Sequence, residues 1–127
     1  MRVLALDHGT ARCGAAICDP SGTIVRPLEV IAPPDTSAVA RIVADSDVGQ
    51  VVVGVPVGMS GAEGEQAAIA RRFIDELTEA LAVPVVGYDE RLTTRLAQQT
   101  RRDTGSRAAE DSLAAAHLLE SYLAASS

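Results

Sequence analysis

Acidic side chains stand at the ends of apolar segments at three places in this 127-residue sequence. Asp7 closes an apolar run, Asp89 and Glu90 directly follow a second run at residues 83–88, and Asp111 lies close to the start of the last helical segment. Converging carboxylates repel one another and cannot all remain ionised without a cation. Their oxygens suit hard divalent ions, and two such ions roughly 4 Å apart activate a water and stabilise the leaving oxygen of a phosphodiester. Such a set predicts metal-dependent phosphodiester hydrolysis, provided that the fold gathers the acids.

Each acid also has a structural explanation that needs no metal. Asp7 can open a turn with Gly9, and Asp89 can cap the helix that follows it. Asp111 can be favoured by the dipole at a helix N-terminus. Three acids at one end of a sheet would be a less ordinary coincidence, so the elements that carry them decide between the two interpretations.

Hydrophobic patterning predicts an α/β fold. Strands are expected at residues 2–7, 14–18, 23–31, 51–55 and 83–88, and helices at residues 37–45, 65–81, from 93 or 94 to 102, and 108–125. This order predicts a five-stranded mixed sheet, with an antiparallel meander of the first three strands followed by parallel strands, and helices on both faces. If the first, fourth and fifth strands are parallel, Asp7 and the Asp89–Glu90 pair lie at the same carboxyl edge, where such sheets bind ligands.

Helical periodicity and strand alternation orient some of these side chains. Asp111 shares a helix face with Ala114, Ala115, Leu118 and Tyr122. It therefore stands at the N-terminal end of a row of side chains that we expect to be buried. The helix at 65–81 is expected to bury Ala68, Ile69, Phe73, Leu77 and Leu81. His8 points to the opposite face from Asp7, and Cys13 and Cys18 point to opposite faces of one strand, which favours two reduced core thiols over a disulfide.

Composition limits the classes of protein that the chain can form. Hydrophobic residues make up 47% and charged residues 22%, which is ordinary for a globular protein, and we expect a single domain over residues 1–127. No apolar run approaches the ~20 residues that span a bilayer. Asp7 interrupts the N-terminal apolar stretch too early for a secretory signal, so a cytoplasmic protein is expected.

The net charge of −6 argues against a nucleic-acid partner, but the distribution of charge is uneven. All eleven basic residues are arginines, and residues 91–107 contain five of them with Asp103 as the only acid. Arginine suits bidentate contact with phosphate oxygens, whereas a solvated helix face is the alternative explanation. Charge alone supports phosphate contact and a solvated helix face equally.

Four motifs, in order, resemble those of the YqgF (RuvX) family. They are LALDHGTARCGAAICD, VVVGVPVGMSGAEG, YDERLTT and EDSLAAAHLLESYL, and together they span nearly the whole chain. The resemblance implies a ribonuclease H-like nuclease domain that depends on Mg²⁺ or Mn²⁺, with two ions. The family has been described both as the nuclease that matures the 5′ end of pre-16S ribosomal RNA and as a Holliday junction resolvase.

The resemblance also implies roles for individual residues. Asp7, Glu90 and Asp111 match the metal-binding, catalytic carboxylates, and Asp89 stands where it can assist them. The phosphate backbone of an rRNA precursor or a branched DNA would be bound by Arg12, Arg91, Arg95, Arg101 and Arg102. The segment between Thr94 and Asp111 is several residues shorter than the family pattern, which bears on substrate binding more than on metal binding. Monomer and homodimer both stay open.

Two other classes of function remain as alternatives. The Asp-x-Gly-Thr turn also opens the sugar-kinase and actin-like ATPases, which need a second domain to close over ATP. A nucleic-acid-binding module without catalysis is the other alternative, and the presence of all three acids disfavours it.

Overall fold

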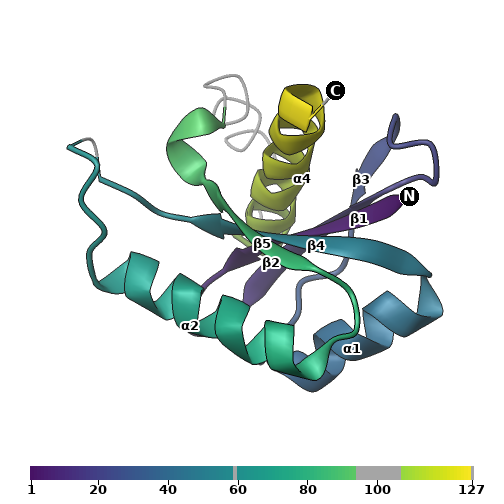
Figure 1. The fold of residues 1–127 in the computed structure, drawn as a ribbon, viewed down its shortest axis with the longest axis horizontal. Coiled ribbons are helices and arrows are strands. Elements are labelled where there is room, and N and C mark those ends of the chain that lie inside the picture. Colours follow the sequence, from purple (N-terminus) through teal and green to yellow (C-terminus); the bar gives the residue numbers. More distant parts are fainter. Residues whose placement is uncertain (59, 94–106, 127) are drawn as a thin grey trace.

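The computed structural model describes residues 1–58, 60–93 and 107–126. Five strands form one mixed sheet in the order β3-β2-β1-β4-β5 (Figure 1). They are β1 (Arg2–His8), β2 (Cys13–Cys18), β3 (Val25–Pro27), β4 (Val48–Val55) and β5 (Val85–Asp89). β1, β2 and β3 pair in antiparallel fashion, and β1, β4 and β5 run parallel. The predicted mixed sheet is confirmed, with the carboxyl ends of β1, β4 and β5 at one edge.

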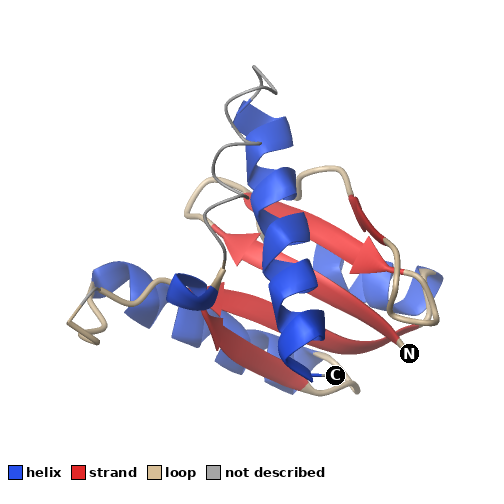
Figure 2. Ribbon diagram, turned by 90° about the horizontal axis from the view of Figure 1, so that it is seen from above, coloured by secondary structure: helices blue, strands red, loops and turns tan. Residues whose placement is uncertain are grey.

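Helices cover both faces of this sheet. The helical elements are α1 (Thr36–Asp45), α2 (Glu65–Ala80), the short 3-10 helix η1 (Glu90–Leu92) and α4 (Arg107–Ser126). Figure 2 shows α4 crossing one face of the sheet, with α1 and α2 behind the other face. Asp35 caps α1 because its side chain accepts a hydrogen bond from the Ala38 amide at 2.8 Å.

The two faces bury different side chains. The face under α1 and α2 carries large aliphatic residues that pack around Phe73 and Leu77. The face under α4 carries smaller residues, including Ala5 and Ala16, which pack against Ala115 of that helix. Cys13 belongs to the first cluster and Cys18 to the second, which confirms that the two free thiols lie on opposite faces.

Two details of the sequence prediction are wrong. The strand expected at residues 23–31 is reduced to β3, after which only Leu28 and Ile31 keep backbone hydrogen bonds to β2. Ala68 is exposed, because the buried stripe of α2 contains Ala67 and Ala70 instead.

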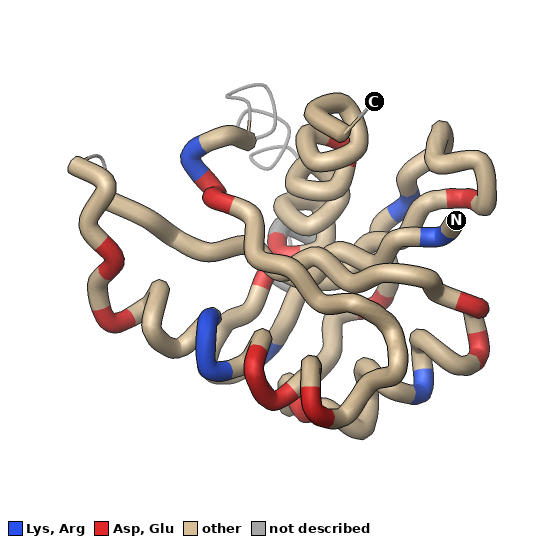
Figure 3. The backbone as a smooth tube through the Cα atoms, in the orientation of Figure 1, with Lys and Arg blue, Asp and Glu red and all other residues tan. Residues whose placement is uncertain are grey.

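Charge is concentrated outside the middle of the sheet. Figure 3 shows charged residues of both signs along α2 and near strand ends, whereas the central residues of β1, β2 and β4 are uncharged. The helix predicted from residue 93 or 94 to residue 102 lies outside the described residues from residue 94 onward. Thr93 itself caps the end of η1. In the described part of the chain, no helix combines the length and the apolar character needed to cross a membrane.

Candidate active site at the carboxyl edge of the sheet

Asp7 lies on the α4 face at the carboxyl end of β1. Side chains alternate along a strand, and Val3 and Ala5 pack in the α4 cluster, so Asp7 projects to the same face. Asp7 pairs with Gly14 of β2. On its other side Leu6 pairs with Val53, which places Asp7 level with Gly54 of β4. The acid is therefore flanked by a glycine on each neighbouring strand.

Glu90 reaches back over the sheet from η1. A methyl group built on Gly54 would lie 2.6 Å from Glu90 Oε1 and 3.0 Å from its Cγ. The Glu90 carboxylate thus occupies the space that any larger residue at position 54 would fill. Because Gly54 is level with Asp7, the fold brings these two acids to the same place on the α4 face, as the sequence predicted for this edge.

Asp111 comes to the other side of Asp7 through the close approach of α4 to β2. A methyl group on Gly14 would clash with the Asp111 carbonyl oxygen, so only glycine permits this packing. The Asp111 carboxylate accepts a hydrogen bond from Arg12, with 2.6 Å between Nε and Oδ2. About a quarter of the Asp111 side chain is exposed, at 27%.

Asp89 and Arg91 form a second acid–arginine pair at this edge. The Arg91 guanidinium donates to both Asp89 oxygens, with the shortest contact at 2.7 Å from Nη2 to Oδ2. Arg91 Nη1 also donates to the Gly58 carbonyl at 3.3 Å. Asp89 caps η1 by accepting from the Arg91 amide, and these hydrogen bonds hold the pKa of Asp89 below its usual value. The capping role weighed for Asp89 in the sequence is confirmed.

Two serines of α4 tether the elements that carry the acids. Ser112 is buried and donates to the Leu28 carbonyl at 2.6 Å, next to Asp111 in the chain. Ser121 donates to the Leu92 carbonyl at 2.9 Å and shares a hydrogen bond with the Tyr88 hydroxyl at 3.0 Å. The two hydrogen bonds of Ser121 lie on either side of Glu90 in the chain, so they attach the segment that carries Glu90 to the helix that carries Asp111.

The donor atoms at this edge fit a divalent cation in type, because they are carboxylate oxygens. Asp7, Glu90 and Asp111 come from β1, η1 and α4 to one face of the sheet, and two glycines of the neighbouring strands allow η1 and α4 to approach it closely. Among the side chains that the structure describes, no three His, Cys, Asp or Glu residues are drawn together into a ready ligand set. Asp111 is bonded to Arg12 in this arrangement, and that pairing matters for cation binding.

The nearby thiol and imidazole are poorly suited to catalysis. Burial, with the negative charges of Asp7 and Asp111, raises the pKa of Cys13 to about 12, so its nucleophilic thiolate is disfavoured. His8 stacks on Phe73 on the opposite face, with ring centroids 4.2 Å apart, as its position in the strand predicted. Burial lowers the pKa of His8, although the negative charges of Glu76 and Asp7 act to raise it.

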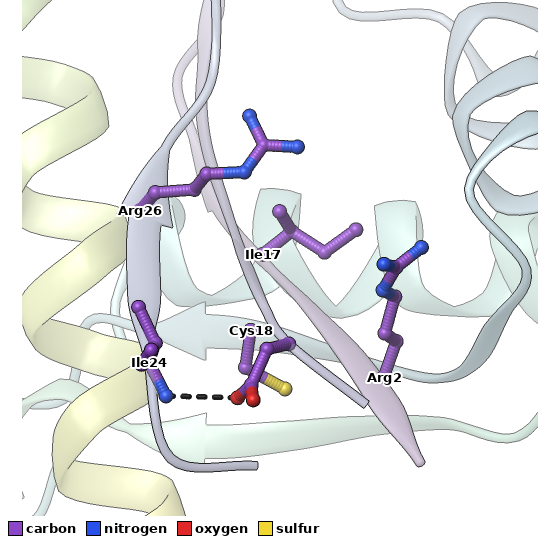
Figure 4. Close-up of a pocket in the computed structure, with 6 residues that line it drawn as sticks. Arg2, Ile17, Cys18, Ile24 and Arg26 are labelled. Atoms are coloured by element: carbon purple, nitrogen blue, oxygen red, sulfur yellow. Dashed lines mark hydrogen bonds between the residues drawn. The ribbon is translucent and has the colours of Figure 1, made fainter. Parts of the chain in front are cut away.

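A small cavity lies at the other end of the sheet and is unrelated to these acids. Its volume is about 140 Å³, and it is lined by Arg2, Ile17, Cys18, Asp19, Ile24 and Arg26 (Figure 4). The Ile24 amide donates to Asp19 Oδ1 at 2.8 Å, so the Asp19 carboxylate is already engaged by the backbone of the turn that it closes. We assign no role to this cavity.

Sequence reasoning located the acids but overlooked the residues that position them. Arg95, Arg101 and Arg102 lie outside the described residues. Gly14, Gly54, Ser112 and Ser121 were not singled out. A glycine inside a strand signals a close approach of another chain segment, so the two glycines were detectable in principle. The serines carry no comparable signal, because their partners are backbone carbonyls far away in the sequence.

The sheet order and the helices on both faces define a ribonuclease H-like fold of the kind found in junction resolvases. The structure titled "T. thermophilus RuvC in complex with Holliday junction substrate" matches with a TM-score of 0.65, covering 100% of this chain and 97% of that chain at 16% identity. The fowlpox virus Holliday junction resolvase matches with a TM-score of 0.63, covering 98% and 99% of the two chains at 12% identity. At these identities the similarity concerns the fold.

Comparison at the sequence level identifies the family. The model of RuvX, described as "Holliday junction resolvase", matches residues 1–125. A Chloroflexus aurantiacus protein named "Putative pre-16S rRNA nuclease" is 42% identical, over 95% of this chain and 85% of its own length. An Anaeromyxobacter protein of the same name is 40% identical, over 97% and 96%. The chain belongs to the RuvX family of nucleases, which confirms the resemblance seen in its motifs.

Proposed function

We propose that this nuclease is metal-dependent, cleaves phosphodiester bonds in structured RNA and matures the 5′ end of pre-16S ribosomal RNA. The observation that carries the proposal is the position of Asp7 between two glycines, one beneath Glu90 and the other against Asp111. This arrangement supports the proposal because it brings the elements that carry Asp7, Glu90 and Asp111 to one face at the carboxyl edge of the sheet. The choice of RNA follows the names of the relatives with about 40% identity.

In this proposal Asp7, Glu90 and Asp111 hold the cation, and Asp89 assists. When bound, one or two Mg²⁺ or Mn²⁺ ions supply Lewis-acid stabilisation of the phosphate and lower the pKa of an attacking water. Asp7 is carried by the sheet itself and is the most firmly positioned of the three. Ser121 ties the backbone segment of Glu90 to α4, and Ser112, next to Asp111, ties α4 to the Leu28 carbonyl.

The arginines supply the contacts to the substrate. We infer that Arg12, Arg91, Arg95, Arg101 and Arg102 neutralise phosphates of the backbone. Arg91 has a further structural role, because it joins Asp89 to the Gly58 carbonyl and so ties the loop after β4 to η1. Contacts of this type bind the backbone without reading the base sequence.

The substitution Asp7→Asn tests the mechanism. We expect cleavage of a pre-16S leader RNA with Mg²⁺ or Mn²⁺ to fall by about a thousandfold, because one ligand charge is lost, while circular dichroism stays unchanged. Asp45→Asn is the matched control, since Asp45 is an exposed acid at the end of α1. Full activity in Asp7→Asn would refute the mechanism.

The family description favours a second candidate, a Holliday junction resolvase. The same assay therefore includes a four-way DNA junction and single strands of RNA and DNA. Preferential cleavage of the junction, abolished by Asp7→Asn, would keep the proposed site and replace the proposed substrate. Binding of RNA with no cleavage under either ion would instead support a binding module.

A further inference from the structure

The pair formed by Arg12 and Asp111 links two segments 99 residues apart. Arg12 precedes β2, and its Nε donates to Asp111 Oδ2 at 2.6 Å. The pair is largely shielded, since the two side chains are 32% and 27% exposed. A charge-assisted hydrogen bond of this length is strong, so Asp111 has a specific cationic partner within the protein itself.

This pairing competes with cation binding at the same carboxylate. A guanidinium and a divalent ion on one carboxylate repel each other, and the described side chains show no ready group of three metal ligands. Arg12 Nε occupies one of the two Asp111 carboxylate oxygens at 2.6 Å, so loosening or loss of this contact frees that oxygen for an ion shared with Asp7 and Glu90.

The backbone around Arg12 allows its side chain to move alone. The Arg12 carbonyl accepts a hydrogen bond from the Gly9 amide at 2.9 Å, which closes the turn between β1 and β2. The next residue, Cys13, is fully buried and paired with Ile31 on one side. The main chain is thus anchored, and rotation of the long arginine side chain is sufficient to release Asp111.

We propose that Arg12 is an exchangeable positioning residue: it neutralises Asp111 before metal binding, yields it to the cation, and then presents its guanidinium to a substrate phosphate. The exchange couples metal loading to substrate binding, because the cation frees the group that contacts phosphate. This inference rests on the proposed metal-dependent function.

NMR of the arginine side chains tests the exchange directly. The Nε–H signal of Arg12, assigned from its loss in Arg12→Lys, should move away from its hydrogen-bonded position as diamagnetic Mg²⁺ saturates the wild-type protein. Arg71 is the internal control, because its Nε donates to Glu63 at 2.8 Å on the surface of α2, and its signal should not move. An Arg12 signal that stays fixed while Mg²⁺ binds would overturn the exchange.

Calorimetry supplies the second measurement. Removal of the competitor in Arg12→Gln should tighten Mg²⁺ binding by about three- to tenfold, whereas Arg71→Gln should bind like the wild type. Equal affinity in Arg12→Gln and the wild type would overturn the inference and leave the metal site intact. A wild-type protein that binds neither Mg²⁺ nor Mn²⁺ and cleaves nothing would refute the proposed function, and the exchange with it.

Discussion

The two faces of the sheet are built from different side chains, and the contrast is sharpest at its carboxyl edge. On the face under α1 and α2, large residues such as Leu4, Leu6 and Leu77 are fully buried. That face ends at His8, whose ring is stacked on Phe73. His8, the last residue of β1, therefore packs against α2 and contributes apolar contact there.

On the opposite face, small residues let α4 come very close to the sheet. Gly14 and Ala16 of β2 lie beneath this helix, and Gly54 lies beneath Glu90. That face ends at Asp7, one residue before His8. Because adjacent residues of a strand point to opposite faces, one strand end serves packing on one side and, in the proposed function, chemistry on the other. Substitutions on the two faces should therefore affect different properties.

Phe73→Ala should have the largest effect and should act on stability. Removing a buried aromatic ring costs about 3–5 kcal/mol of the free energy of unfolding, measured by urea denaturation. Cleavage per folded molecule, assayed in the cold, should change little, because Phe73 lies on the face away from Asp7. Phe73→Leu is the milder variant if the first does not fold. A large loss of cleavage in the fully folded Leu variant would show that the two faces are not separable.

Gly54→Ala should have an intermediate effect and should act on the site. The added methyl group would meet the end of the flexible Glu90 side chain, which can move aside at little cost to the fold. We expect Mn²⁺ affinity to fall by about tenfold, because a ligand is displaced, with a small change in melting temperature.

Gly49→Ala is the matched control for that variant. Gly49 lies in the same strand at its other end, and a methyl group there would also meet a flexible side chain, that of the exposed Met1. Its metal affinity should equal that of the wild type. Equal losses in both variants would mean that any added side chain in β4 disturbs the site through the strand.

The smallest effect is expected from the pH dependence of His8. Its pKa is lowered by burial, so below about pH 6.5 the unfolded chain binds more protons than the folded protein, and stability falls as the pH falls. In His8→Asn this contribution disappears, and the melting temperature should drop less between pH 7 and pH 5 than in the wild type. Identical pH profiles would contradict the assignment.

Much of the fold was predictable because its signals are local. The strand expected at residues 51–55 forms the continuously buried part of β4, and the helix expected at residues 37–45 is α1. The strand prediction failed where β3 leaves the ladder soon after Pro27, since the loss of pairing at an edge depends on the neighbouring strand. Ala68 was misplaced because the buried stripe of α2 depends on where the sheet meets the helix.

The sequence by itself determined which apolar segments the acids follow, and so placed Asp7, Asp89 and Glu90 at one edge once the parallel order was inferred. Only the tertiary structure decided how they are arranged there. It set Gly14 and Gly54 on either side of Asp7 and joined Arg12 to Asp111. The physical reason is that strand register and the closeness of α4 are properties of packed pairs of elements. Propensity and periodicity act within one element and cannot specify them.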